Sequence, residues 1–131
     1  MINDKYTIYT DGGSRGNPGP SACAFVIHGV HQQGYYLGIG TNNNAEYMGV
    51  LKAYAYLSPI QSPPVLNFYL DSELVVKQLT GLYKIKDSNL QRIAFEIKKF
   101  QKNYSVTYTH IPRSQNIIAD LLVNQTLDKN Y

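Results

Sequence analysis

Residues 5–20 read KYTIYTDGGSRGNPGP, and this stretch sets the start of the fold. Residues 5–10 are rich in Tyr, Ile and Thr, a composition typical of a β-strand. Gly, Asn and Pro then dominate residues 12–20, which predicts a long turn. Asp11 stands between the two, so the sequence predicts a carboxylate directly after the first strand.

Hydrophobic spacing and turn residues predict the elements that follow. A hairpin connection at residues 31–33 makes the first three strands antiparallel. The predicted elements are strands at 22–30 and 34–40, a helix at 44–57 ended by Pro59, a strand at 65–70, a helix at 72–79, an amphipathic helix at 90–100 with Ser88 as its N-cap, a strand at 104–109 and a helix at 114–127. This order predicts an α/β fold, a mixed sheet with helices packed on its faces.

Length and composition bound the class of protein. The chain has 131 residues, 44% of them hydrophobic and 16% charged, with a mean hydropathy of −0.29. One domain spanning residues 1–131 is expected, and disordered and collagen-like classes are excluded. We expect no membrane span and no secretory signal. The single cysteine, Cys23, cannot form an internal disulfide, which fits a cytoplasmic protein.

Four acidic residues are candidates for chemistry. Asp11 and Asp71 directly follow predicted strands, at the sheet edge where α/β folds place their sites. Glu46 lies in the first turn of its predicted helix, and Asp120 lies mid-helix within the apolar stretch 117–122. Simpler interpretations remain open: a turn residue for Asp11, an N-cap for Asp71 and a helix-dipole acid for Glu46. A carboxylate among apolar neighbours, as at Asp120, requires a partner, a metal or a wet cleft.

If the four carboxylates converge, they form an oxygen-rich site suited to Mg²⁺ or Mn²⁺. Their mutual repulsion would be severe without cations. Two ions roughly 3.5–4 Å apart would relieve it and assist an in-line phosphoryl displacement. The net charge is +3, so acids gathered in one pocket leave the remaining surface basic, as a polyanionic substrate requires.

Four blocks of sequence resemble ribonuclease H of type 1. They are TDGGSRGNPG at residues 10–19, TNNNAE at 41–46, LDS at 70–72 and HIPRSQNIIAD at 110–120, and they occur in the family's order. The resemblance spans residues 6–124. It implies a five-stranded mixed sheet with helices on both faces.

The resemblance also implies the chemistry. Asp11 would contact two Mg²⁺ ions, Asp120 would help hold the ion that activates water, and Glu46 and Asp71 would hold the other. Mn²⁺ is a possible substitute. The implied reaction is endonucleolytic cleavage of the RNA strand of an RNA/DNA hybrid, leaving 5′-phosphate and 3′-hydroxyl ends. No membrane or obligate protein partner is implied, and a monomer is expected.

Further roles follow by position in the family's motifs. His110 and Arg113 are alternatives for the family's mobile histidine, with Arg113 favoured; its guanidinium would act electrostatically on phosphate. Turn and capping roles stand as alternatives for the asparagines. The residues expected to contact nucleic acid are Gly12, Gly13, Asn17, Thr41, Asn42 and Asn43.

The chain departs from the family pattern in one feature that bears on its affinity for the hybrid. Larger family members insert a basic helical protrusion, whereas here only residues 81–87 separate two predicted helices and the chain has no Trp. The chain therefore resembles a short form, in which Lys77, Lys84 and Lys86 are a reduced substitute. Two alternatives remain: a catalytically silent hybrid-binding module, and a different nuclease of the same superfold.

Overall fold

The computed structural model describes residues 5–58 and 65–130. Its sheet has the strand order β3-β2-β1-β4-β5, with β1 antiparallel to β2, β2 antiparallel to β3, and β1, β4 and β5 parallel. The strands are β1 (Lys5–Ser14), β2 (Gly19–Ile27), β3 (His31–Gly40), β4 (Val65–Leu70) and β5 (Ser105–His110). The predicted five-stranded mixed sheet is confirmed.

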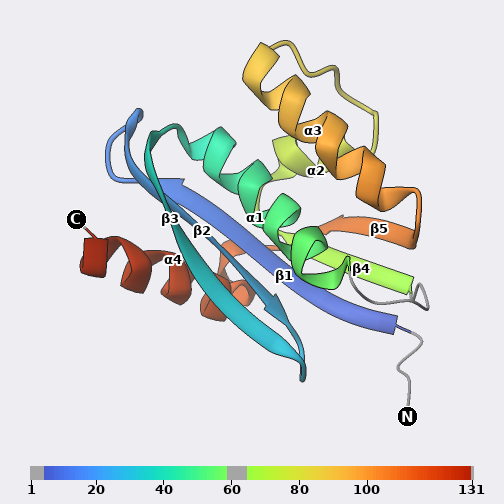
Figure 1. Ribbon diagram of the computed structural model, residues 1–131, viewed down its shortest axis with the longest axis horizontal. Coiled ribbons are helices and arrows are strands. Elements are labelled where there is room, and N and C mark those ends of the chain that lie inside the picture. The colour runs from blue at the N-terminus through green and yellow to red at the C-terminus, as the bar shows by residue number, and fades with distance from the viewer. Residues whose placement is uncertain (1–4, 59–64, 131) are drawn as a thin grey trace.

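Helices cover both faces of the sheet (Figure 1). On one face α1 lies across β1, with α2 and α3 beside it, and α4 packs under β1, β2 and β3 on the other. The helices are α1 (Asn42–Leu57), α2 (Glu73–Leu79), α3 (Ser88–Gln101) and α4 (Ile117–Asn130), with a short 3₁₀ turn η1 (Arg113–Gln115) before α4. None of the helices in the described ranges has the length and apolarity of a membrane span.

Two apolar clusters hold these layers together. The larger one lies between the sheet and α1 and α3, and includes the fully buried side chains of Phe25, Tyr54 and Phe68. The smaller one joins β2 to α4 through residues such as Ala24 and Val123. Burial of large apolar side chains is the main stabilising term here, at about 1.5–3 kcal/mol for each one. Cys23 is also fully buried, as expected for a core residue.

The first strand is longer than its sequence predicts. β1 continues through Ser14 because residues 11–14 pair with residues 21–24 of β2, and the turn shrinks to residues 15–18. The predicted long turn over residues 12–20 is therefore wrong. Glycine has a low intrinsic preference for strands, but the backbone of β2 supplies hydrogen-bond partners for residues 11–14, and intrinsic preference does not include such pairing.

Several predicted boundaries also shift. The hairpin turn falls at residues 28–30 instead of 31–33, and the predicted N-cap Ser88 is the first residue of α3, whose cap is Asp87. The Asp87 side chain accepts from the backbone N–H groups of Asn89 and Leu90, and aspartate is as good an N-cap residue as serine. Helix α4 begins at Ile117 instead of residue 114. The predicted helix end at Pro59 lies outside the described residues.

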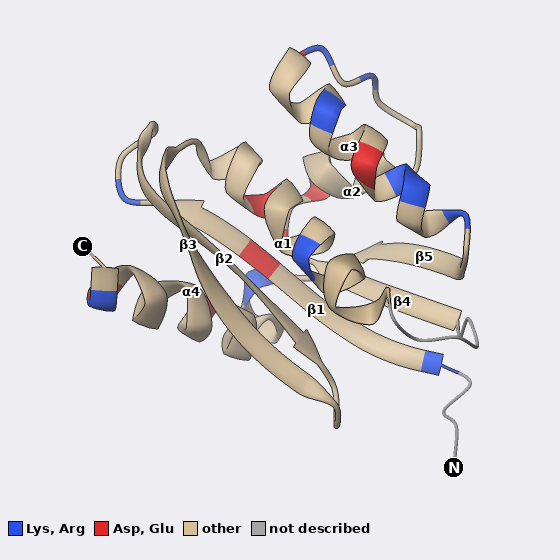
Figure 2. Cartoon of the chain, viewed as in Figure 1, with Lys and Arg blue, Asp and Glu red and all other residues tan. Residues whose placement is uncertain are grey.

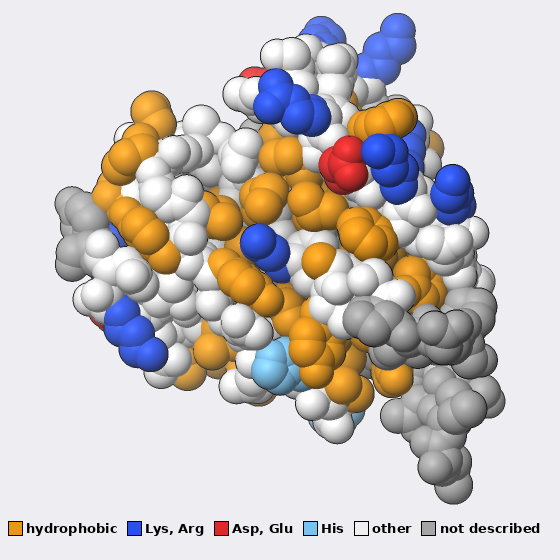
Figure 3. Space-filling model, in the orientation of Figure 1, with side chains coloured by type: hydrophobic (Ala, Val, Ile, Leu, Met, Phe, Trp, Pro, Cys, Tyr) orange, Lys and Arg blue, Asp and Glu red, His pale blue; other side chains and the backbone are white. Residues whose placement is uncertain are grey.

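Basic residues gather along α3 and the loop before it, a region that also carries the acidic Asp87 and Glu96, and further acidic residues lie on β1 and α1 (Figure 2). The space-filling view shows these lysine and arginine side chains standing out over α3 (Figure 3). Of the residues expected to replace the protrusion, Lys84 and Lys86 are exposed in this loop. The Lys77 ammonium instead pairs with Glu73 at 2.9 Å.

Helix α1 approaches β1 so closely that a side chain has no room between them. A Cβ built on Gly12 would lie 2.2 Å from the backbone carbonyl of Ala45. A Cβ on Gly49, from the helix side, would lie 2.8 Å from the carbonyl oxygen of Asp11. Glycine at both positions therefore sets the distance between the helix and the central strand.

Gly12→Ala is expected to lower the free energy of unfolding by about 3 kcal/mol or more, because neither backbone can yield. Gly13→Ala is the matched control, since its Cβ would lie 3.8 Å from the Asn42 side chain, an ordinary contact. Urea unfolding followed by circular dichroism measures both. Equal stability losses in the two variants would contradict the proposed steric limit.

Candidate active site

Two of the candidate acids lie side by side because of strand pairing. Asp11 lies within β1, the central strand, and not after its end as predicted, since β1 extends to Ser14. Asp71 directly follows β4, which runs parallel to β1 with Thr10 opposite Leu70. This register brings the next residues of the two strands, Asp11 and Asp71, together.

The structure does not bear out the N-cap interpretation of Asp71. Ser72 caps α2 instead, and its hydroxyl accepts from the backbone N–H of Val75 at 3.2 Å. The Asp71 carboxylate accepts from the side-chain amide of Asn116 at 3.1 Å. Asp71 is thus left to face the site instead of the helix end.

The other two acids come from helices on opposite faces of the sheet. Glu46 is the fifth residue of α1, beyond the first turn in which it was predicted, because Thr41 caps a helix that begins at Asn42. A helix-dipole role for Glu46 is correspondingly weak, since that effect fades within the first turn.

Asp120 lies in the first turn of α4 and not mid-helix. Of its apolar neighbours in the sequence, Ile117, Ile118 and Leu121 are exposed, and Asp120 has the partner and the open cavity that its sequence context required. The side chain of Asp120 is instead half-buried and faces Arg113.

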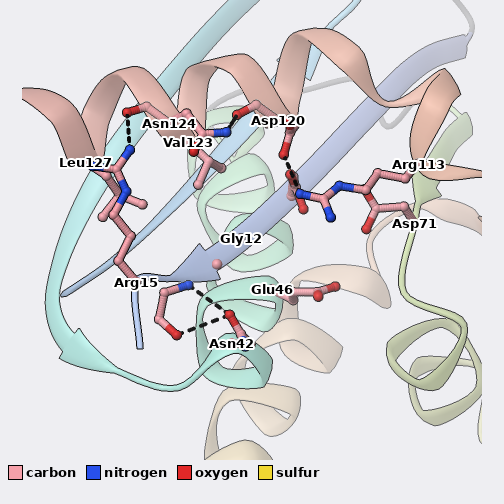
Figure 4. A pocket seen from close by; sticks show the side chains of 13 residues that line it. Gly12, Arg15, Asn42, Glu46, Asp71, Arg113, Asp120, Val123, Asn124 and Leu127 are labelled. Atoms are coloured by element: carbon pink, nitrogen blue, oxygen red, sulfur yellow. Dashed lines mark hydrogen bonds and ion pairs between the residues drawn. The ribbon is translucent and has the colours of Figure 1, made fainter. Parts of the chain in front are cut away.

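All four carboxylates line one cavity of about 440 Å³. Figure 4 shows Glu46 directed into this space from α1, with Asp71, Arg113 and Asp120 on the opposite side. Arg15 closes one end by reaching from the turn after β1 to Asp128 of α4, at 2.7 Å. The predicted convergence of the acids on one pocket is therefore observed.

Burial and mutual repulsion shift the acids toward their neutral forms. Desolvation, followed by the charge of Asp71, raises the pKa of Asp11 from 3.8 to about 7. Desolvation and the charges of Asp11 and Asp71 raise the pKa of Glu46 from 4.5 to about 8. The Arg113 guanidinium lowers both pKa values but does not offset these causes.

The donor set fits a hard divalent cation. Its candidate ligands are carboxylate oxygens, the donors that Mg²⁺ and Mn²⁺ prefer. Within residues 5–58 and 65–130, no three Asp, Glu, His or Cys side chains are arranged as a closed metal site. The acids instead surround an open cavity, in which a cation would offset the repulsion that raises their pKa values.

The expected nucleic-acid contacts fall into two adjoining groups. Gly12 and Gly13 line the acid cavity itself. Asn17, Thr41 and Asn43 line a neighbouring cavity of about 550 Å³ at the start of α1, and Asn42 lines both cavities. The structure therefore brings these residues to one continuous surface.

Three of these polar side chains also organise the loop itself. The Thr41 hydroxyl accepts from the Asn44 N–H at 3.1 Å as the cap of α1. The Asn17 side chain accepts from the Asn42 N–H at 3.0 Å, and the Asn42 side chain accepts from the Ser14 N–H at 2.8 Å. Thr41, expected only as a nucleic-acid contact, is thus also the N-cap of α1, and Asn17 and Asn42 tie the turn after β1 to the start of that helix.

Comparison with known proteins gives the family. The sequence model of the RNase H family matches residues 3–128. The chain belongs to the ribonuclease H family. The resemblance seen in the four sequence blocks is therefore confirmed.

Similar ribonucleases H include curated and solved examples. Ribonuclease HI of Halobacterium salinarum is 36% identical over 126 residues, which cover 92% of this chain and 63% of that protein. Its crystal structure has a TM-score of 0.88 and 98% coverage of the solved chain. A bifunctional protein of Mycobacterium tuberculosis is 31% identical over 131 residues. The match covers 95% of this chain but only 36% of the length of the mycobacterial protein.

A solved structure of LC11-RNase H1, a protein isolated from compost, holds an RNA/DNA hybrid. It is 36% identical, with a TM-score of 0.90, and the match covers 95% of this chain and 98% of that one.

The structure distinguishes His110 from Arg113 by position. Arg113 lines the acid cavity, with its guanidinium 3.4 Å from an oxygen of Asp120. His110 is the last residue of β5. Its ring lies 3.9 Å from Glu73 and is not among the residues lining the cavity.

Asn116 is a residue of the candidate site that the sequence patterns did not reveal. It is 1% exposed and donates to Asp71 and to the carbonyl oxygen of Thr10. Its only signal was its place in the sequence block at 110–120, because the helix predicted from residue 114 placed Asn116 inside a helix, where an asparagine does not indicate a site.

The raised pKa values predict a stability profile for the metal-free protein. Above pH 4 the unfolded chain releases the Asp11 proton while the folded chain retains it up to about pH 7, so rising pH favours unfolding across this window. Asp11→Asn is expected to be more stable than the parent at pH 8 in EDTA, by at most about 4 kcal/mol. The difference should shrink toward zero near pH 4. Urea unfolding at both pH values measures it, and a pH-independent difference would contradict the assignment.

Proposed function

We propose that this chain is an endoribonuclease that cleaves the RNA strand of RNA/DNA hybrids. The observation that carries the proposal is the convergence of Asp11, Glu46, Asp71 and Asp120 on one cavity of a ribonuclease H fold. The hybrid held by LC11-RNase H1, at 36% identity, supports the choice of substrate.

The four acids would hold two Mg²⁺ ions, with Mn²⁺ as a possible substitute. When bound, these ions would acidify an attacking water and stabilise charge on the scissile phosphate, so that products carry 5′-phosphate and 3′-hydroxyl ends. Asp11 lies between Asp71, directly after the neighbouring strand β4, and Glu46 on the overlying helix α1, so it would help to hold both ions.

Protein groups around the acids would position the hybrid. Gly13 leaves open surface at the cavity, where backbone can approach a 2′-hydroxyl of the RNA strand. The neighbouring cavity at the start of α1 offers Thr41, Asn17 and Asn43 to the nucleic acid. Arg113, exposed at the cavity rim, would attract and orient a phosphate.

The setting of the enzyme is also part of the proposal. A buried, unpaired Cys23 is compatible with the reducing cytoplasm. We propose that the protein acts there as a monomer, because all four acids of the candidate site come from one chain.

Asp71→Asn is expected to lower RNA cleavage at least about 100-fold, because it removes a charge that would hold the metal. The measurement is cleavage of an end-labelled RNA/DNA hybrid in Mg²⁺, with duplex DNA as a second substrate. Hybrid binding without cleavage by the parent, in Mg²⁺ or Mn²⁺, would favour a silent binding module. Cleavage of duplex DNA would favour a different nuclease, and equal cleavage by both proteins would contradict the acid assignment.

Arg113→Ala is expected to lower kcat roughly 10-fold or more through lost electrostatic stabilisation, with Arg113→Lys intermediate. His110→Ala should change kcat by less than about threefold, since that ring points toward Glu73. Arg92→Ala, an exposed arginine of α3, controls for the loss of one positive charge. A larger effect at His110 than at Arg113 would reverse the assignment of the two residues.

A further inference from the structure

Asn116 occupies a helix-capping position but does not cap. It directly precedes α4, and its backbone carbonyl accepts from the N–H of Asp120 at 3.1 Å. A capping asparagine uses its side-chain oxygen to accept from the first turn of the helix. Among the described residues, the Oδ1 atom of Asn116 has no hydrogen-bond partner.

The side chain instead uses its amide group to donate. One hydrogen bond runs from Nδ2 to the carbonyl oxygen of Thr10 at 2.9 Å, and a second runs to Oδ2 of Asp71 at 3.1 Å. The opposite amide orientation would place an oxygen against two acceptors, so these partners fix the orientation that is seen. Asn116 is 1% exposed, so the bond to Thr10 is buried and the bond to Asp71 is partly buried.

These bonds connect Asn116 to the segments that carry three of the four acids. Thr10 directly precedes Asp11 on β1, Asp71 is bonded through its own carboxylate, and Asp120 is bonded through its backbone. The bond to Asp71 holds one of its two carboxylate oxygens, Oδ2, and thereby restricts rotation of the carboxylate.

We infer that Asn116 is a positioning residue that sets the Asp71 carboxylate in the orientation required to bind a divalent cation. The inference rests on the proposed function and extends it to a residue that does not itself contact the metal. Outer partners of this kind typically contribute about 10–100-fold to metal affinity.

The test begins with metal binding in the absence of nucleic acid. Mn²⁺ affinity is measured from water-proton relaxation for the parent, Asn116→Ala, and Asn130→Ala as the matched control. Asn130 is the last residue of α4, and its side chain donates to the Thr126 carbonyl at 2.8 Å, away from the cavity. Asn116→Ala is expected to bind Mn²⁺ about 10–100-fold more weakly, and the control within about twofold of the parent.

Hybrid cleavage gives a second readout. For Asn116→Ala, the Mg²⁺ concentration for half-maximal cleavage should rise in parallel with the loss of Mn²⁺ affinity, while KM for the hybrid stays within about twofold. If Asn116→Ala does not fold, as judged by its thermal melt, Asn116→Ser replaces it, because a small hydroxyl fills part of the site and retains a donor.

A double-mutant cycle with Asp71→Asn separates positioning from general support of the fold. If Asn116 acts through Asp71, its loss should reduce Mn²⁺ affinity by less than about threefold once that carboxylate is neutral. The inference would be overturned if Asn116→Ala lowered Mn²⁺ affinity by the same factor in the parent and in Asp71→Asn. It would also be overturned if Asn116→Ala lowered stability but left Mn²⁺ affinity unchanged. A parent that neither binds Mn²⁺ nor cleaves hybrid would instead refute the proposed function.

Discussion

The close contact of α1 with the central strand is the constraint on which the site depends. Gly12 on β1 and Gly49 on α1 leave no Cβ between the two backbones, so the helix lies directly over the strand. This contact is what carries Glu46 to Asp11, since the two acids belong to different layers of the fold. Larger residues at these positions would lift the helix away and separate the two carboxylates.

A rigid core supports this arrangement from the side away from the cavity. The hydroxyl groups of Tyr54 on α1 and Tyr108 on β5 lie 2.7 Å apart, and the Tyr108 hydroxyl donates to Gln101 of α3 at 2.9 Å. A helix, an edge strand and a second helix are thereby joined by a buried polar network. Such a network, surrounded by apolar packing, can hold like charges together at the site although they repel one another.

The position of each acid could be predicted from the sequence only where neighbouring residues determine it. That Asp71 follows a strand is readable from the apolar run at 65–70 and the break after it, and the structure agrees. The position of Asp11 is harder to predict from the sequence, because its place inside β1 depends on pairing with Ala24 of β2. The apolar run around Asp120 correctly indicated that its carboxylate needs a partner or a cleft, but it did not reveal that Ile117, Ile118 and Leu121 face solvent.

The sequence by itself determined the order of strands and helices, the four acids and the family, because hydrophobic period, turn residues and short motifs are properties of neighbouring residues. Only the tertiary structure decided the length of β1, the contact at Gly12, the position of Arg113 in the cavity and the role of Asn116. Each of these depends on partners far away in the chain: Asn116 bonds to a residue 106 positions before it and to another 45 before it. Such partners become neighbours only when the chain has folded.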